Sequence, residues 1–209
     1  MVFKKKELID RWSNDQYLEM IKKEIETIKN GNKIIENVDL AGIIIGPSAV
    51  MGIKDLNFYK VNFLNVDLSH CEISGSINNA YLNNVNFFKA KLDRSTMFKA
   101  EILNCNFSYS KIIVNMDDAV CEDCNFASVQ FNAGTLGLEY GGRRVKFKNC
   151  NFTNAIFNRV EFRASKFINC NFENTKFINC DFRGVKLEGL NSPHSSQFEK
   201  MDIPEWATV

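Results

Sequence analysis

Large apolar residues recur at every fifth position through the second half of the chain. Between residues 146 and 185 the recurring residue is always an aromatic one: Phe147, Phe152, Phe157, Phe162, Phe167, Phe172, Phe177 and Phe182. Two positions before each lies a small or branched residue: Val145, Cys150, Ala155, Val160, Ser165, Cys170, Thr175 and Cys180. A period of five fits neither an amphipathic helix nor an ordinary strand. The pattern therefore predicts a repeat architecture.

Twenty residues form a larger unit. When residues 146–165 are aligned with 166–185, Lys146, Asn149 and Cys150 match as well as the aromatic residues. Four short sides joined by turns would form one square coil, and stacked coils would lie at the strand spacing of ~4.8 Å. In such a coil the Phe or Leu fills the axis and the small residue also points inward. The Asn or Asp between them can bond turn backbone, and the other two positions face solvent.

This small–polar–large triplet recurs in phase from about Val38 to Leu187, for example in NVNFFKAKLDRS and NCNFENTKF. It resembles the pentapeptide-repeat family, whose consensus is A-(D/N)-L-x-x. The resemblance implies an all-β solenoid, a right-handed quadrilateral β-helix of stacked coils. It implies a fold far more strongly than a function.

Several segments depart from the five-residue phase. Residues 37–41 look like a first repeat, and residues 42–53 break the phase around Pro47 and Gly52. Steps of four residues at Ile77 and Met116 are expected to be local tightenings at corners. The glycine-rich segment 134–145, which includes Leu136, is expected to be either a bulged corner or a loop projecting from the shaft.

The segment before the repeats is predicted to be helical over residues 7–30. Ser13 and Gln16 suggest a capping box where two helices meet, and Gly31 a helix stop. One helical face carries Leu18, Ile21, Ile25 and Ile28. We interpret this segment as an α-helical cap over the open first coil, with a partner-binding helix as the alternative.

The repeats are expected to end at Leu187, leaving a tail whose apolar residues have no repeat phase: Phe198, Met201, Ile203 and Trp206. These residues could cap the last coil or form a dimer contact. The expected organisation is a helical segment at 1–33, a repeat domain at 34–190 and a tail or cap at 191–209. The protein would be a monomer, or a dimer through a terminal cap.

The composition limits the partners and the cellular compartment that we expect for this protein. The net charge of +1 argues against a general electrostatic attraction of the protein to nucleic acids or membranes. An odd number of cysteines, seven, without a signal peptide favours the reducing cytoplasm. All except Cys121 occupy the small inward position. Cys150 and Cys170 would lie within disulfide range on successive coils. Their parallel side chains and the reducing compartment argue against a disulfide bond between them. The lone Cys121–Cys124 pair is weak evidence for zinc.

No catalytic constellation is visible. His70 falls on an outward position and His194 in a loop, and neither has a nucleophile in the pattern. A shaft filled with Phe leaves no substrate-sized pocket. We therefore expect no enzyme activity, no cofactor and no metal. The acidic residues Asp117, Asp118, Glu122 and Asp123 could hold a cation or simply form a solvated corner.

Charge is segregated along the chain. Residues 34–139 contain seven Lys or Arg against twelve Asp or Glu, whereas residues 140–190 contain ten against four. Outward residues of stacked coils should align in columns, so Arg163 and Arg183 should share one. The candidate partner-binding residues are Tyr140, Arg143, Arg144, Arg163 and Arg183.

These observations favour a rigid module for binding an unidentified protein partner. The family resemblance implies an alternative, because some pentapeptide-repeat proteins look like B-DNA, bind type II topoisomerases such as DNA gyrase, and protect them from fluoroquinolones. Those members are strongly acidic rods, whereas residues 140–190 here are basic. Direct nucleic-acid binding is not expected.

Overall fold

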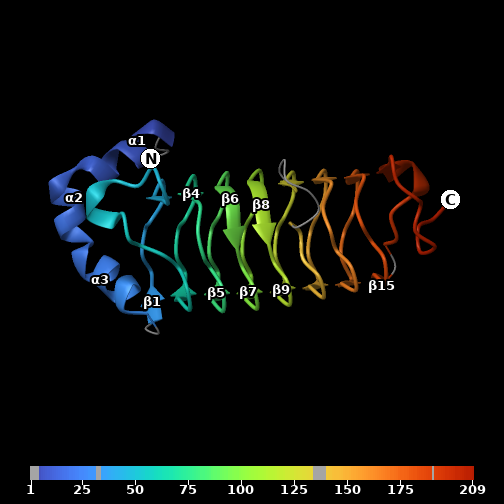
Figure 1. The fold of residues 1–209 in the computed structure, drawn as a ribbon, viewed down its shortest axis with the longest axis horizontal. Helices are drawn as coiled ribbons and strands as arrows, with labels where there is room; N and C mark the ends of the chain where they lie inside the picture. The colour runs from blue at the N-terminus through green and yellow to red at the C-terminus, as the bar shows by residue number, and fades with distance from the viewer. Residues whose placement is uncertain (1–4, 32–33, 134–139, 190) are drawn as a thin grey trace.

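The protein is a four-sided parallel β-solenoid with helices at its N-terminal end (Figure 1). The structure, a computed structural model, describes residues 5–31, 34–133, 140–189 and 191–209. Successive coils stack along one axis, so the two ends of the chain lie at opposite ends of the shaft. This confirms the predicted solenoid.

Two of the four faces are parallel sheets of eight strands each. The first face contains β1 (Ile34–Glu36), β3 (Asn62–Leu64), β5 (Tyr81–Asn83), β7 (Glu101–Leu103), β9 (Val120–Glu122), β11 (Lys146–Lys148), β13 (Lys166–Ile168) and β15 (Lys186–Glu188). The opposite, third face contains β2 (Ile44–Ile45), β4 (Glu72–Ile73), β6 (Lys91–Thr96), β8 (Lys111–Asn115), β10 (Gln130–Asn132), β12 (Ile156–Asn158), β14 (Lys176–Ile178) and β16 (Phe198–Glu199).

The other two faces are held by single bridges between coils. The second face follows Asp39, Asp67, Asn86, Asn106, Asn125, Asn151 and Asn171. The fourth face follows Ser76, Thr96, Asn115, Gly141, Glu161 and Asp181, and Thr96 pairs with Asn115 at the ends of β6 and β8. Each coil therefore passes through all four faces before it meets its neighbour.

The aromatic column fills the axis as predicted. Phe147 pairs in register with Phe167, twenty residues later, and their rings stack with centroids 5.0 Å apart. All eight Phe residues of the repeat stretch are buried, and so are the small residues two positions before them. The seven cysteines are buried and unpaired, and they pack as small apolar residues.

The Asn and Asp residues of the second face perform the predicted turn role. Asp67 Oδ1 accepts a hydrogen bond of 2.8 Å from the backbone N–H of Ser69. It also accepts a hydrogen bond of 3.0 Å from Asn86 Nδ2. Asn86 Oδ1 in turn accepts a hydrogen bond of 3.0 Å from Asn106 Nδ2. The side chains thus link successive coils as well as closing each turn.

At most corners the chain turns through a residue in the left-handed region, two positions after the central one. Asn149, Asn154 and Asn169 are examples, with φ of 52°, 59° and 51°. Asn tolerates this conformation better than most residues. The four-residue step before Met116 lacks such a residue, and β8 runs extended through it. The coil is unbroken as expected, but this corner is straightened, not tightened.

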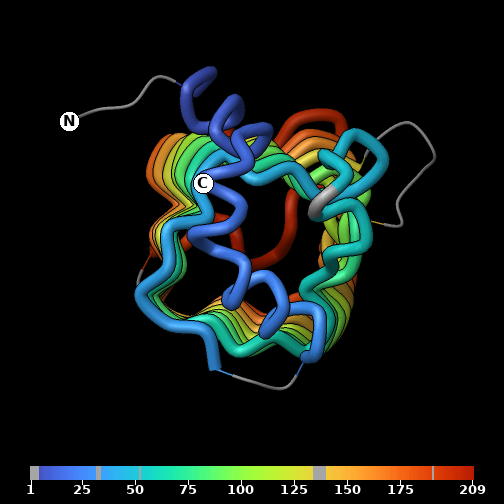
Figure 2. Tube along the Cα trace, turned by 90° about the vertical axis from the view of Figure 1, so that its left-hand side faces the viewer, coloured from blue at the N-terminus to red at the C-terminus, as the bar shows by residue number. Residues whose placement is uncertain are grey.

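The N-terminal helices lie across the open end of the first coil (Figure 2). They are α1 (Lys5–Asp10), the 3-10 helix η1 (Arg11–Ser13), α2 (Asp15–Met20) and α3 (Lys22–Asn30). The inward face of α3 buries Ile25 and Ile28. Two helices meet near Ser13 as expected, but the capping-box prediction is wrong. Asn14 is the N-cap, and its side chain accepts from the N–H of Tyr17 at 3.0 Å.

The cap docks through polar contacts with the first coil. Arg11 donates to both carboxylate oxygens of Asp39, at 2.8 and 2.7 Å. The indole N–H of Trp12 donates to the carbonyl of Ala41 at 3.0 Å, and Trp12 is 2% exposed. The helical segment is therefore joined to the column of Asn and Asp residues at its first member.

The first phase break begins later than predicted. Ile45 still occupies a central position and pairs with Ile73, twenty-eight residues later. The extra residues follow Ile45 and include the 3-10 helix η2 (Met51–Ile53). They leave the square outline at one corner (Figure 2).

The C-terminal tail adds one more strand, so the prediction that Phe198 has no repeat phase is wrong. Phe198 pairs with Phe177, and the two rings stack at 5.0 Å. The 3-10 helix η3 (Ser195–Gln197) precedes it, with His194 as its N-cap. The Trp206 ring packs against Phe182 and Phe198, at 5.7 Å from each, and covers the last coil.

Candidate functional site

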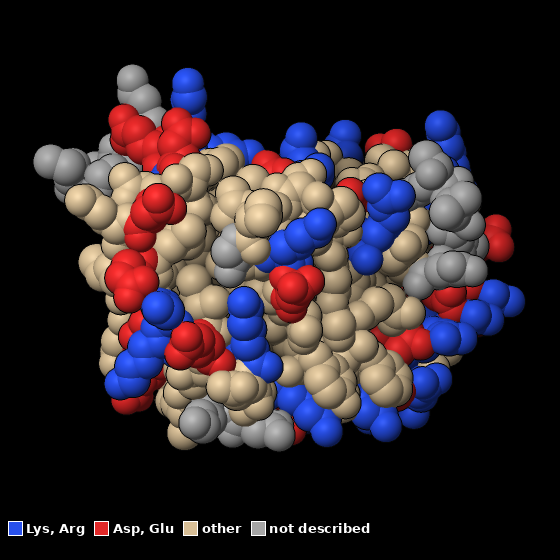
Figure 3. Space-filling model, turned by 60° about the vertical axis from the view of Figure 1, so that its left-hand side comes forward, with Lys and Arg blue, Asp and Glu red and all other residues tan. Residues whose placement is uncertain are grey.

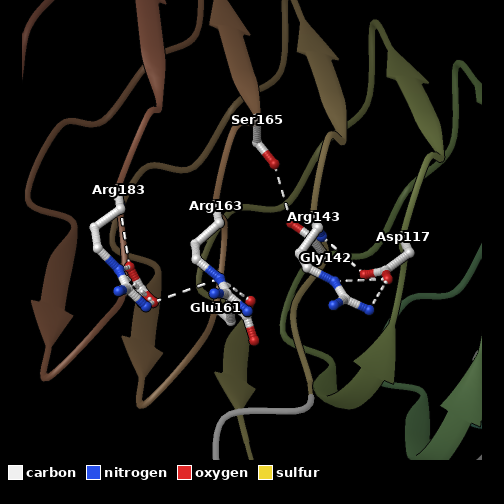
Figure 4. A network of polar contacts seen from close by, with 8 residues as sticks. Asp117, Gly142, Arg143, Glu161, Arg163, Ser165 and Arg183 are labelled. Carbon is white, nitrogen blue, oxygen red and sulfur yellow. Dashed lines mark hydrogen bonds and ion pairs between the residues drawn. The ribbon is translucent and has the colours of Figure 1, made fainter.

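Three arginines occupy equivalent positions on successive coils, at the edge between the fourth and first faces (Figure 4). The carbonyl of Arg163 accepts from the N–H of Arg144 at 3.0 Å, and that of Arg183 accepts from Ala164 at 2.9 Å. We call Arg143, Arg163 and Arg183 the arginine edge. The predicted pair, Arg163 and Arg183, does share a column, and Arg143 extends it by one coil.

Each member of the arginine edge lies beside a carboxylate. Arg143 contacts Asp117 with Nη2 and Oδ2 2.6 Å apart, and Arg183 contacts Asp181 at 2.6 Å. Arg163 contacts Glu161 and also lies 3.7 Å from Asp181. The acidic side chains are nearly buried, whereas the arginines keep much of their surface exposed, 75% for Arg183.

The acidic cluster and the basic corner predicted from the sequence face each other across one coil boundary. Arg144 binds Asp118 through two hydrogen bonds of 2.6 and 2.8 Å, and Lys148 pairs with Glu122. The Arg144 hydrogen bond holds the pKa of the Asp118 carboxyl below its usual value. With Arg143–Asp117, these contacts form an ionic seam between the acidic and basic halves. Among the described residues, no group of side chains is arranged to hold a metal ion.

Glycine residues shape the fourth face beside the seam. The N–H of Gly142 donates to the carbonyl of Glu161 at 2.7 Å, as that of Phe162 does to Asp181 at 2.8 Å. Gly142 therefore takes the central position of its coil, and Ser165 Oγ donates to its carbonyl at 3.0 Å (Figure 4). Lys146 pairs with Val120, twenty-six residues earlier, so this coil is longer than twenty residues. Leu136 and the first half of the predicted bulge or loop, residues 134–139, lie outside the described residues.

A second basic column lies on the first face, and the sequence analysis missed it. Lys146 pairs in register with Lys166, and Lys166 with Lys186, on β11, β13 and β15. All three are exposed. We call them the lysine ladder. Its signal in the sequence is a Lys before the central residue at twenty-residue intervals.

The arginine edge and the lysine ladder are close neighbours in each of the three coils that carry them. Arg143 precedes Lys146 by three residues, around one corner, and Arg163 and Arg183 stand in the same relation to Lys166 and Lys186. Together with Arg144 they form a basic surface on the last coils. Tyr140 is half-buried, and its carbonyl accepts from Glu161 N–H at 3.0 Å, so it contributes to the backbone ladder.

Residues 143–206 match the family model for a pentapeptide repeat region. These residues, on the last coils, form a pentapeptide repeat region. No curated protein matches the sequence significantly.

Solved structures of pentapeptide-repeat proteins resemble this one. A trypsin-treated form of QnrB1, a plasmid-mediated fluoroquinolone resistance protein, has a TM-score of 0.51 at 13% identity, covering 75% of this chain and 93% of its own. HetL from the cyanobacterium Nostoc, a protein involved in heterocyst differentiation regulation, has a TM-score of 0.30 at 12% identity, covering 74% and 84%. The likeness to QnrB1 shows the fold alone.

His194 and the buried cysteines have structural roles. His194 Nδ1 accepts from the N–H of Ser196 at 3.2 Å, which caps η3. Burial raises the pKa of Cys71, and it raises the pKa of Cys180 to about 11, so these thiols stay protonated at neutral pH. Among the described residues, no helix is long and apolar enough to cross a membrane.

The surface charges are mixed on the face shown in Figure 3. Over the coils Lys and Arg lie beside Asp and Glu, whereas Asp and Glu gather along the left side of the view. An acidic stripe is the feature that DNA mimicry needs, since duplex DNA carries a regular array of negative charges.

Proposed function

We propose that this pentapeptide-repeat protein is a non-enzymatic interaction module that binds a protein partner through its basic surface. The observation that carries the proposal is the alignment of the arginine edge with the lysine ladder on three successive coils. Stacked coils repeat these cations at a spacing of ~4.8 Å on a rigid support. A partner with complementary charge would meet a pre-ordered array, so little ordering entropy opposes binding.

The residue types support the same proposal. Arg is enriched in protein–protein interfaces, where its planar group forms bidentate bonds. Arg143 and Arg183 are already oriented by Asp117 and Asp181, whose carboxylates are 10% and 11% exposed. These acids fix the direction of the guanidinium groups while leaving their outer edges open to a partner.

A site-specific photo-cross-linker tests the proposal in the native cell. The photoreactive residue would replace Arg163 or Lys166 on the basic surface, and Asn132 on the opposite sheet as a matched control. We expect one discrete protein adduct from the first two positions and none from Asn132. Adducts of equal yield from all three positions, or none from any outward position on the four faces, would contradict the proposal.

Topoisomerase binding is the second candidate, favoured by the fold likeness to QnrB1, a fluoroquinolone resistance protein. A DNA gyrase supercoiling assay, titrated with this protein in the presence and absence of a fluoroquinolone, separates the two. We expect no protection, because the last coils are basic. Protection at micromolar protein would move topoisomerase binding to first place.

We also propose a cytoplasmic location and the three-segment organisation, 1–33, 34–190 and 191–209. Seven buried, unpaired cysteines suit a reducing compartment. Cell fractionation tests the location. Limited proteolysis tests the organisation, with cleavage expected near the two segment boundaries.

A further inference from the structure

We infer that the lysine ladder, Lys146, Lys166 and Lys186, binds a short acidic protein segment that presents about three carboxylates over ~10 Å. The inference rests on the proposed function and names the chemistry of the partner. It concerns the first face alone, so it can fail while the interaction module stands.

The lysine ladder places like charges directly opposite one another. Lys146 and Lys166 are register partners on adjacent strands, and so are Lys166 and Lys186. Like charges at such positions destabilise a sheet. The arrangement contributes nothing favourable to the folded protein by itself, whereas an anionic partner would relieve the repulsion.

Nearby cations are neutralised within the chain, and the lysine ladder is not. Asp117 lies beside Arg143, and on the first face Lys148 pairs with Glu122. On the third face, Lys176 lies 3.9 Å from Glu199. Among the described residues, no carboxylate lies within ion-pair distance of any lysine of the ladder. The ladder is therefore available to carboxylates from outside the chain.

Acidic residues bound the lysine ladder, which favours a short partner. In its own column, Glu101 lies two strands before Lys146. In the neighbouring column, Glu188 lies two residues after Lys186 on the last strand. Duplex nucleic acid carries one charge per ~1.7 Å and would press phosphates against these carboxylates. A peptide with a few acidic residues can match the lysines and avoid both glutamates.

The strands also offer a modest apolar contact. Ile168 is half-buried on β13, in the column beside Lys166. An aliphatic residue between the acidic ones of the partner would cover it. An acidic segment with an interspersed aliphatic residue fits both columns.

Fluorescence anisotropy with the full-length protein tests the inference. The probe is a labelled peptide with Glu at three alternate positions, compared with the same peptide carrying Gln there and with labelled duplex DNA. The test variant replaces Lys146, Lys166 and Lys186 by Gln. The control variant replaces Lys54, Lys91 and Lys111 by Gln, which removes the same charge elsewhere.

We expect the test variant to bind the Glu peptide about tenfold more weakly and the control variant to bind within about twofold of the wild type. The Gln peptide and duplex DNA should bind more weakly than the Glu peptide. Equal losses in both variants, tighter lysine-dependent binding of DNA, or no peptide binding at millimolar concentration would overturn the inference. If a cross-linked partner persists without peptide binding, the proposed function stands and the inference falls.

Discussion

Asp117 accepts three hydrogen bonds from Arg143, which lies twenty-six residues later on the next coil. Asp117 Oδ1 accepts from the backbone N–H at 2.8 Å, and Oδ2 accepts from Nε and Nη2 at 2.9 and 2.6 Å. One carboxylate thus closes the backbone of the longer coil and also orients a member of the arginine edge.

Asp117→Ala should therefore lower the free energy of unfolding by about 1–3 kcal/mol, because it removes charge-assisted bonds to a nearly buried acceptor. Asp117→Asn, which can still accept from the backbone, should lose less. Urea denaturation measures both. Arg143→Gln is the matched control and should have a smaller effect than Asp117→Ala, since the guanidinium is half exposed. Equal losses for Arg143→Gln and Asp117→Ala would mean that the backbone contact is unimportant.

Phe172 and Lys176 test the inward and outward assignment. Phe172 is 4% exposed and stacks on Phe152 with centroids 5.4 Å apart, so Phe172→Ala should cost about 3–5 kcal/mol. Lys176→Ala should cost less than about 0.5 kcal/mol, because its side chain is exposed and its ion pair is long. Thermal and urea unfolding measure both. A loss below about 1 kcal/mol for Phe172→Ala would exclude the aromatic column as the core.

The core was predictable because its signal repeats. A residue at the axis must be large and its inward neighbour small, and Phe147 and Val145 show this rule in the sequence as clearly as in the structure. The twenty-residue register followed from the match of Lys146 with Lys166, which the pairing confirms. Each position of the five-residue repeat recurs many times along the chain, so a chance match at one of them does not change the assignment.

The termini and the pairing of charges were harder to predict because they occur once. Phe198 is in phase only because residues 191–197 bring the chain to the third face, and no repeat marks that path. Asn14 and Ser13 are both good N-cap residues, but Asn14 caps α2 whereas Ser13 ends η1. The pairing of Arg143 with Asp117 depends on the length of an irregular coil, which periodicity cannot supply.

Position 141 requires glycine because of its backbone conformation and because a neighbouring atom lies close to where a Cβ would be. Its φ is 126°, and a Cβ there would lie 2.2 Å from the carbonyl oxygen of Glu161. Gly141→Ala should therefore lower the free energy of unfolding by at least ~2 kcal/mol. Gly184→Ala is the matched control, because the nearest atom is 3.8 Å away and Ala164 adopts a φ of 55° at the equivalent corner. Urea denaturation compares them, and equal costs would argue against the steric explanation.

Docking of the helical cap should weaken in acid. Arg11 holds the pKa of the Asp39 carboxyl below its usual value through their hydrogen bonds. A carboxyl with a lowered folded pKa adds stability that is fully present above its ordinary pKa of ~3.9 and is lost as the pH falls through the folded value. The cap should therefore loosen below about pH 4.

Trp12 reports this change, because it belongs to the cap and its buried indole donates a hydrogen bond to the carbonyl of Ala41 in the first coil. In a Trp206→Phe background, Trp12 is the remaining tryptophan. Its emission should shift to longer wavelength as the pH falls below about 4, and the shift should reverse on neutralisation. Asp39→Asn should remove this acid transition, because an amide cannot titrate and binds Arg11 more weakly at every pH. An unchanged transition in Asp39→Asn would assign it to another carboxylate.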